Sequence, residues 1–214
     1  MIQAKNISFQ YPKSDRWVLK NFSADFNKNE IIALTGPNGC GKTTLSRILV
    51  GILKPKRGNV YIDNVDTAQL SLAEIGKKIG LVMQHPARQL FCTTVQEEME
   101  YGLKNLGLDE AEIAKRVQYY LEYFQLENYK EVFPFEMSYG EKQRLVLAAI
   151  LAMRPEYLLL DEPTASLDVY RQKLLGELIT KIHKETKTGI IIISHDRDFI
   201  EKYATKEIKM EVAE

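Results

Sequence analysis

The sequence has no excess of charge of either sign and very little cysteine. Lysine plus arginine and aspartate plus glutamate each number 29 among the 214 residues. Such a balance gives no support for wholesale binding to nucleic acid, and we expect no nucleic-acid partner. The two cysteines, Cys40 and Cys92, do not make a disulfide framework. This composition fits a reducing cytosol.

The sequence also lacks long apolar runs, repeats and low-complexity segments. The N-terminus, Met1–Lys5, has no apolar signal core. The longest apolar run, Leu145–Met153, is far too short to span a bilayer. We therefore expect any association with a membrane to go through a partner. The length suits one domain, or one domain with an inserted subdomain.

One glycine-rich stretch stands out, because it fits the phosphate-loop pattern G-x-x-x-x-G-K-[ST]. Its residues are Gly36, Pro37, Asn38, Gly39, Cys40, Gly41, Lys42, Thr43 and Thr44. Residues 30–35 before it read as a buried strand, and residues 42–53 after it read as a helix. A chance glycine-rich turn is the alternative, but strand, turn and helix are the context that the motif requires.

Each part of this loop suits a triphosphate. Glycines let the backbone curl so that several N–H groups point inward, where side chains would block a phosphate. The following helix adds free amides and the positive end of its dipole. Lys42 supplies a cation for the outer phosphates, and the Thr43 hydroxyl is a suitable ligand for Mg²⁺. We therefore expect a nucleoside triphosphate as ligand and Mg²⁺ as cofactor.

The hydropathy pattern predicts an α/β protein. Residues 2–11 and 18–26 alternate, with a slip in the first segment, and indicate an antiparallel β layer. Apolar runs at 79–83, 157–160 and 190–193 fit buried strands of a parallel sheet. Residues 88–154 turn helical, and we expect an inserted helical subdomain there, in a single domain whose core is 1–87 and 155–214.

Local signals predict the helix positions. Apolar residues recur on one face over 95–106 and 113–124. Asp109 is the expected cap of the second of these helices. Ser138 precedes an expected helix over 141–153, and a long helix over 169–187 should end at Gly189.

Polar groups follow several buried strands, at the edge of the sheet where ligands of parallel sheets collect. Asp161 suits a carboxylate that holds Mg²⁺, and Glu162 a general base that orients water. Their alternative is a surface acidic pair after a core strand. Gln84 offers its amide to Mg²⁺ and water, or is a turn residue. His195 donates to the γ-phosphate, or is a neutral capping histidine.

Taken together, the motifs resemble those of the ATP-binding cassette (ABC) ATPases along almost the whole chain. The matching pieces are Tyr11 as adenine-stacking aromatic, Gly36–Thr44 as Walker A, Gln84 as Q-loop, Met137–Glu141 as signature, Leu158–Glu162 as Walker B, Ser166–Asp168 as D-loop and His195 as switch histidine. On its own, Tyr11 is better read as a half-buried residue at a sheet edge, and only the resemblance favours the stacking role. The resemblance implies a P-loop NTPase of ABC type, with a mixed sheet core, an antiparallel layer and an inserted helical subdomain.

A finer resemblance rests on the segments Gln84–Pro86, Gln89–Phe91 and Thr94–Glu98. They are similar to the ATPase subunits of energy-coupling factor (ECF) importers, which take up vitamins and transition metals. The resemblance implies an ATPase on the cytoplasmic face of the cell membrane that powers such a transporter. It also implies a peripheral placement, with an integral membrane subunit docked near Gln84–Tyr101.

The signature departs from the family's usual Leu-Ser-Gly-Gly-Gln. Ser138 and Gly140 remain, so a hydroxyl and a backbone amide at a helix start are still present to meet phosphate. Tyr139 adds bulk where glycine is usual, and Glu141 adds negative charge near the expected phosphate. These changes bear on the strength of the nucleotide contact across a dimer, and leave the fold unaffected.

The resemblance implies a head-to-tail dimer with a second ABC domain of the same or another chain. ATP on Walker A of one domain is covered by Ser138 and Gly140 of the other, while Asp168 communicates between the sites. All the residues that one chain must contribute to its own ATP are present, which predicts hydrolysis. They are Lys42, Thr43, Gln84, Asp161, Glu162 and His195. Two alternatives remain: a soluble ABC switch without transport, and a cassette of low activity paired with an active one.

Overall fold

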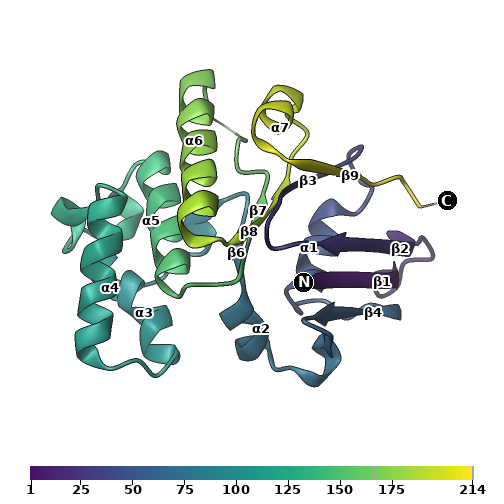
Figure 1. Cartoon of the computed structure of the whole chain (residues 1–214), viewed down its shortest axis with the longest axis horizontal. Helices are drawn as coiled ribbons and strands as arrows, with labels where there is room; N and C mark the ends of the chain where they lie inside the picture. Colours follow the sequence, from purple (N-terminus) through teal and green to yellow (C-terminus); the bar gives the residue numbers. More distant parts are fainter. Residues whose placement is uncertain (166, 214) are drawn as a thin grey trace. The chain divides into compact units, whose positions relative to one another are not determined.

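The computed structural model describes residues 1–165 and 167–213, and most of its helices and strands are labelled in Figure 1. The chain divides by its contacts into two units. The first contains residues 1–81 and the chain from 156 onwards, and the second contains Val82–Pro155. The expected subdomain boundaries, after residues 87 and 154, lie close to these divisions.

The first unit contains an antiparallel sheet with the strand order β2-β1-β4-β5. Its strands are β1 (Ile2–Phe9), β2 (Leu19–Phe26), β4 (Arg57–Ile62) and β5 (Val65–Asp66). The register between β1 and β2 shifts after Ala4 and again after Ile7, where Asn6 has a φ of 52°. These irregularities are the physical origin of the slip in the alternating pattern of residues 2–11.

A second sheet has the order β6-β7-β8-β3-β9. Its strands are β3 (Ile31–Thr35), β6 (Ile79–Val82), β7 (Tyr157–Asp161), β8 (Gly189–Ile193) and β9 (Lys206–Lys209). Strands β7, β8, β3 and β9 pair in parallel. Every residue of β7 and β8 is buried and both strands lie inside the sheet, which confirms the prediction that the runs at 157–160 and 190–193 are central strands. Strand β6, from the run at 79–83, lies at the edge of the sheet.

Helices α1 (Lys42–Leu49), α2 (Leu72–Lys78), α6 (Val169–Thr186) and α7 (Arg197–Tyr203) complete the first unit. Two helix ends differ from expectation. Helix α1 stops before Leu53, because Gly51 turns the chain at a φ of 78°. Lys187, at a φ of 58°, ends α6 in place of Gly189. Gly189 instead begins β8, where a Cβ would lie 2.7 Å from the Tyr157 ring.

The second unit is helical, as predicted. It contains α3 (Val95–Asn105), α4 (Glu110–Tyr123) and α5 (Tyr139–Ala152), which pack on one another. A short 3-10 turn precedes α3 at Pro86–Arg88, and two more lie between α4 and α5, at Glu127–Tyr129 and Pro134–Glu136. Asp109 caps α4 through the Glu112 amide at 2.9 Å, which confirms its predicted role. Helix α5 begins earlier than expected because Ser138 caps it directly.

Among the described residues, no helix is long and apolar enough to cross a membrane.

Candidate nucleotide site

The phosphate loop joins β3 to α1, and its glycines are required by the structure. Gly36 has a φ of 147°, and a Cβ there would lie 2.4 Å from the Met210 carbonyl oxygen. Gly41 has a φ of 97°, and its Cβ would lie 2.8 Å from the Leu19 side chain. A side chain at either position would therefore displace a neighbouring segment. The loop backbone is free to curl around a phosphate because both positions are glycine.

Lys42 folds back over this loop. Its Nζ donates to the carbonyl oxygens of Gly36 at 2.8 Å and Pro37 at 3.1 Å, and the residue is only 7% exposed. The loop carbonyls therefore hold the ammonium group at the loop itself. Phosphate oxygens are stronger partners for a cation than neutral carbonyls. An anion at this loop would therefore be a stronger partner for Lys42 than either carbonyl.

Thr43 and Asp161 come together from α1 and from the end of β7. The Thr43 hydroxyl donates to Asp161 Oδ1 at 3.4 Å, although the two residues are far apart in the chain. Burial raises the pKa of Asp161, with the charge of Glu162 adding to the effect, while the Thr43 hydrogen bond lowers it. A buried carboxylate of this kind gains from a nearby cation.

The Thr43 and Asp161 side chains are chemically suited to hold Mg²⁺. Hydroxyl and carboxylate oxygens are the ligands that a hard cation takes, and Mg²⁺ usually fills its shell with phosphates and water. No cluster of three or more His, Cys, Asp or Glu side chains suited to a metal occurs in the described part of the chain. A hydroxyl and a carboxylate of this kind suit an ion whose other ligands come from a nucleotide and water.

Glu162 and His195 also meet, from the ends of β7 and β8. His195 Nδ1 lies 2.9 Å from Glu162 Oε2, with the Glu162 side chain 13% exposed and the His195 side chain 70% exposed. The Glu162 amide donates to the Ile193 carbonyl at 2.8 Å, and its φ is 49°. The end of β8 thus holds Glu162 in an uncommon backbone conformation.

Tyr11 lies beside the loop helix. Its hydroxyl is 3.1 Å from the hydroxyl of Thr44, and its ring packs edge-on against Phe9 with the centroids 5.0 Å apart. The residue remains 37% exposed. A ring that is anchored at the phosphate loop and open to solvent suits the predicted stacking role.

The first unit therefore brings most of the predicted cis residues together. Thr43 and Asp161 are in contact, Glu162 follows Asp161, and His195 contacts Glu162. Lys42 precedes Thr43 at the start of α1 and influences the Asp161 carboxylate electrostatically. The expected convergence at the sheet edge is met for these residues. Gln84 belongs to the second unit, and its place at the nucleotide stays a prediction.

The signature lies at the start of α5 in the second unit. Ser138 Oγ accepts from the Glu141 amide at 3.4 Å, and the Ser138 side chain also hydrogen-bonds to the Glu141 carboxylate. Glu141 Oε1 accepts from the Tyr129 hydroxyl at 2.7 Å, and Oε2 accepts from the Ser138 amide at 2.8 Å. These bonds, that of Tyr129 first, lower the pKa of Glu141. A Cβ on Gly140 would have no atom within 4 Å.

These contacts change what the altered signature implies about negative charge near a bound phosphate. Glu141 is held by its own helix start and by Tyr129, so its charge is partly compensated. The contact from Tyr129 was not foreseen, because a lone tyrosine in a loop carries no sequence pattern. Asp168 caps α6 by accepting from the Arg171 amide at 2.8 Å. Ser166 lies outside the described residues.

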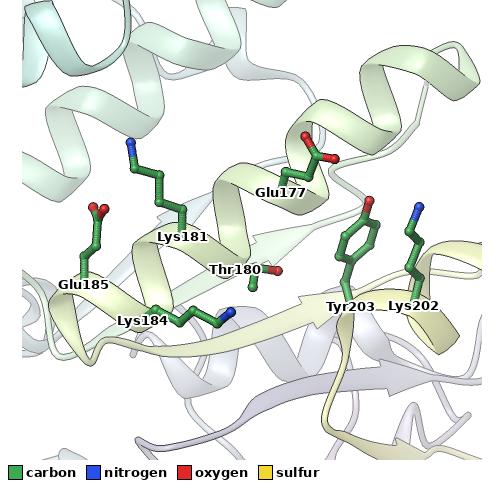
Figure 2. Close-up of a pocket in the computed structure, with 7 residues that line it drawn as sticks. All are labelled: Glu177, Thr180, Lys181, Lys184, Glu185, Lys202 and Tyr203. Carbon is green, nitrogen blue, oxygen red and sulfur yellow. The ribbon is translucent and has the colours of Figure 1, made fainter.

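A separate hollow of about 460 Å³ lies between α6 and α7. Figure 2 shows three lysines at its walls, Lys181, Lys184 and Lys202, beside Glu177 and Glu185. Its charges largely offset one another, and none of its lining residues belongs to the phosphate loop. It is a surface groove of mixed charge and not part of the nucleotide site.

The loop, the Thr43–Asp161 pair and the Glu162–His195 pair define the class of phosphate-loop nucleotide triphosphatases. A family model described as ABC transporter matches residues 19–165. The chain belongs to this family and is an ABC ATPase.

Related sequences carry more specific names. A Pyrococcus furiosus protein, named as an ABC transporter ATP-binding protein, is 42% identical over 206 residues, which cover 96% of this chain and 78% of that protein. The energy-coupling factor transporter ATP-binding protein EcfA2 of Clostridium perfringens is 39% identical over 220 aligned residues, which cover 100% of this chain and 77% of EcfA2.

Solved structures agree with this fold. One is cbiO1 from Clostridium perfringens, described as part of the ABC transporter complex cbiONQ. It has a TM-score of 0.89 and 32% identity, and the match covers 100% of this chain and 86% of cbiO1. Another is a dimeric ATP-binding cassette in a post-hydrolysis state bound to ADP and Pi, with a TM-score of 0.85, 28% identity, and coverage of 100% and 97%. The ABC-type fold is thereby confirmed.

Proposed function

We propose that the chain is the ATP-hydrolysing subunit of an ECF-type importer that takes up a vitamin or a metal ion. Two similarities support this proposal: the resemblance to EcfA2 over the whole chain, and the resemblance to cbiO1. The observation that carries the chemistry is the contact of Thr43 with Asp161 and of Glu162 with His195 at one sheet edge. ATP is the substrate, and water is the nucleophile.

Binding begins with the phosphate loop. The loop amides from Gly36 to Thr44 surround the phosphates, and Lys42 exchanges its two carbonyl partners for phosphate oxygens. Tyr11 stacks on the adenine. Thr43 and Asp161, together with Gln84, would hold Mg²⁺, which supplies neutralisation of the phosphate charge during transfer.

Glu162 acts as the general base. Its carboxylate orients water and accepts a proton as the water attacks the γ-phosphate. His195 holds one oxygen of that carboxylate through Nδ1. With Nδ1 donating to Glu162, Nε2 donates to the γ-phosphate in the imidazolium form of the ring, in which both nitrogens carry protons. The proton leaves the attacking water for Glu162, and the bond to the β-phosphate breaks.

A second ABC domain completes the site. Ser138 and Gly140 of one domain cover the ATP held by the other, and Asp168 joins the two sites. The dimeric cassette among the similar structures supports this arrangement. The place of Ser138 at the start of α5 and the open space at Gly140 both suit a phosphate that approaches from outside the chain.

The remaining parts of the proposal concern the assembly. An integral membrane subunit docks near Gln84–Tyr101, so the chain is peripheral, on the cytoplasmic face of the membrane. Residues 88–154 act as the inserted helical subdomain of a single ABC domain, with residues 1–87 and 155–214 as its core. The chain contains the residues that one ABC domain contributes to its own ATP. Several of them are in mutual contact, which favours an active ATPase over a silent regulatory cassette.

Two measurements test this proposal. The purified chain should hydrolyse ATP in the presence of Mg²⁺, and affinity purification from detergent extracts should recover an integral membrane protein with it. No turnover by the chain alone, restored by a second cassette, would support the silent-partner alternative. Recovery of the chain without any membrane protein would contradict the transport role.

A further inference from the structure

Tyr139, the residue that most alters the signature, contacts the Q-loop inside the second unit. Its hydroxyl donates to the backbone carbonyl of Gln84 at 3.1 Å, across 55 residues of sequence. A glycine at position 139 has no side chain that could make this bond. Burial raises the pKa of Tyr139, so the hydroxyl keeps its proton and remains a donor at neutral pH.

The Q-loop backbone has a second restraint beside this one. The amide of Met83, next to Gln84, donates to the side-chain oxygen of Gln89 at 2.7 Å. The backbone on either side of the Gln84 Cα is thus held by two side chains. The side chain of Gln84 is left exposed and is not itself used in these bonds. These restraints reduce the backbone freedom of Gln84 before any ligand binds.

On the other side of Tyr139 lies Ser138, the N-cap of α5. The single residue Tyr139 therefore connects the helix start that carries Ser138 with the backbone that carries Gln84. Under the proposed function, Gln84 serves the ATP of its own chain, and Ser138 serves the ATP of the partner. One hydrogen bond thus connects the parts of the chain that carry these two groups.

We infer that Tyr139 is a positioning residue that ties the signature to the Q-loop, so that the Gln84 side chain is preset for the reacting nucleotide. This inference rests on the proposed function, because it assigns Gln84 a task at ATP. The inferred role of Tyr139 concerns the hydrolysis step, which follows ATP binding. Loss of the hydroxyl should therefore reduce kcat, with little effect on the KM for ATP.

The test is the variant Tyr139→Phe in the full chain, which keeps the ring and removes only the hydroxyl. We expect kcat for Mg-ATP to fall about fivefold, the factor expected for one net hydrogen bond. This loss of kcat should disappear in a Gln84→Ala background, because residue 84 then has no amide side chain for the restrained backbone to orient. The matched control is Tyr119→Phe on the exposed face of α4, which should leave turnover and exchange unchanged.

Amide hydrogen exchange gives a readout that does not depend on activity. Amides of residues 83–89 should exchange faster in Tyr139→Phe than in the parent chain, while those of α4 should not change. Unchanged exchange would overturn the inference. An equal loss of kcat in the parent and the Gln84→Ala background would also overturn it. Faster exchange in a chain that hydrolyses no ATP would instead refute the proposed function and keep the structural link.

Discussion

Replacement of Glu162 by glutamine tests the centre of the proposed mechanism. Glutamine keeps the length and shape of the side chain, and its amide oxygen still accepts from His195 Nδ1, which lies 2.9 Å from Glu162 Oε2. The backbone contact of residue 162 with Ile193 does not involve the side chain. The substitution therefore removes the basic group and little else, so folding and ATP binding should persist.

The expected loss of kcat is about 10²- to 10⁴-fold, the range that a positioned general base contributes. The assay is phosphate release at saturating Mg-ATP, together with nucleotide binding by equilibrium titration. Turnover reduced by less than about tenfold would refute the role of Glu162 as base.

The same strand supplies a matched control. Glu156 precedes β7, and its carboxylate pairs with Lys28 at 3.1 Å and Lys78 at 3.0 Å. Glu156→Gln makes the same chemical change at the opposite end of the strand that carries Glu162. It should lower stability without changing kcat. A comparable loss of kcat in both variants would indicate that any charge change near β7 disturbs the enzyme.

Three further predictions follow from the site. Burial raises the pKa of Asp161, which means that the folded, nucleotide-free chain disfavours the ionised carboxylate. The free energy of unfolding should therefore fall as pH rises through that pKa. Asp161→Asn should therefore raise the nucleotide-free Tm, by about 2–4 °C per kcal/mol relieved, yet abolish Mg-dependent turnover. Glu207→Gln should lower Tm instead, because Thr35 and Arg197 hold the pKa of Glu207 low. A lower Tm in both variants would contradict the expected rise for Asp161→Asn. Tyr11→Ala should weaken ATP binding about 5- to 100-fold, whereas Tyr11→Phe keeps the stacking face and should bind nearly normally. Glu141→Gln should keep the cap of α5 and remove a negative charge, so half-maximal turnover should need less ATP; calorimetry and an ATP titration check this, and a higher requirement would contradict it.

Strand and loop positions could be predicted from local patterns. The run of apolar residues in β3, β7 and β8 is long enough to require burial on both faces, and each run ends in a turn or a charged residue. The phosphate loop is recognisable because its glycines and Lys42 keep a fixed spacing. The helix starts at residues 94, 109 and 138 carry capping side chains that act within one turn.

Features that depend on distant partners could not be predicted in the same way. The end of α6 is one example, since Lys187 adopts the left-handed conformation while Gly189 is needed where the Tyr157 ring packs. The hydrogen bond from the Tyr129 hydroxyl to Glu141 is another. Neither contact has a periodic signal, because each joins residues that only the folded chain places together.

The amino-acid sequence by itself determined the kind of protein: a phosphate-binding loop, carboxylates after buried strands and an altered signature, all set by short-range spacing. The tertiary structure alone decided how these groups are held. It placed the Thr43 hydroxyl at the Asp161 carboxylate, His195 at Glu162, and the Tyr139 hydroxyl at the Gln84 carbonyl. Hydrogen bonds act over about 3 Å, so groups that lie far apart in the chain meet only after the backbone has folded.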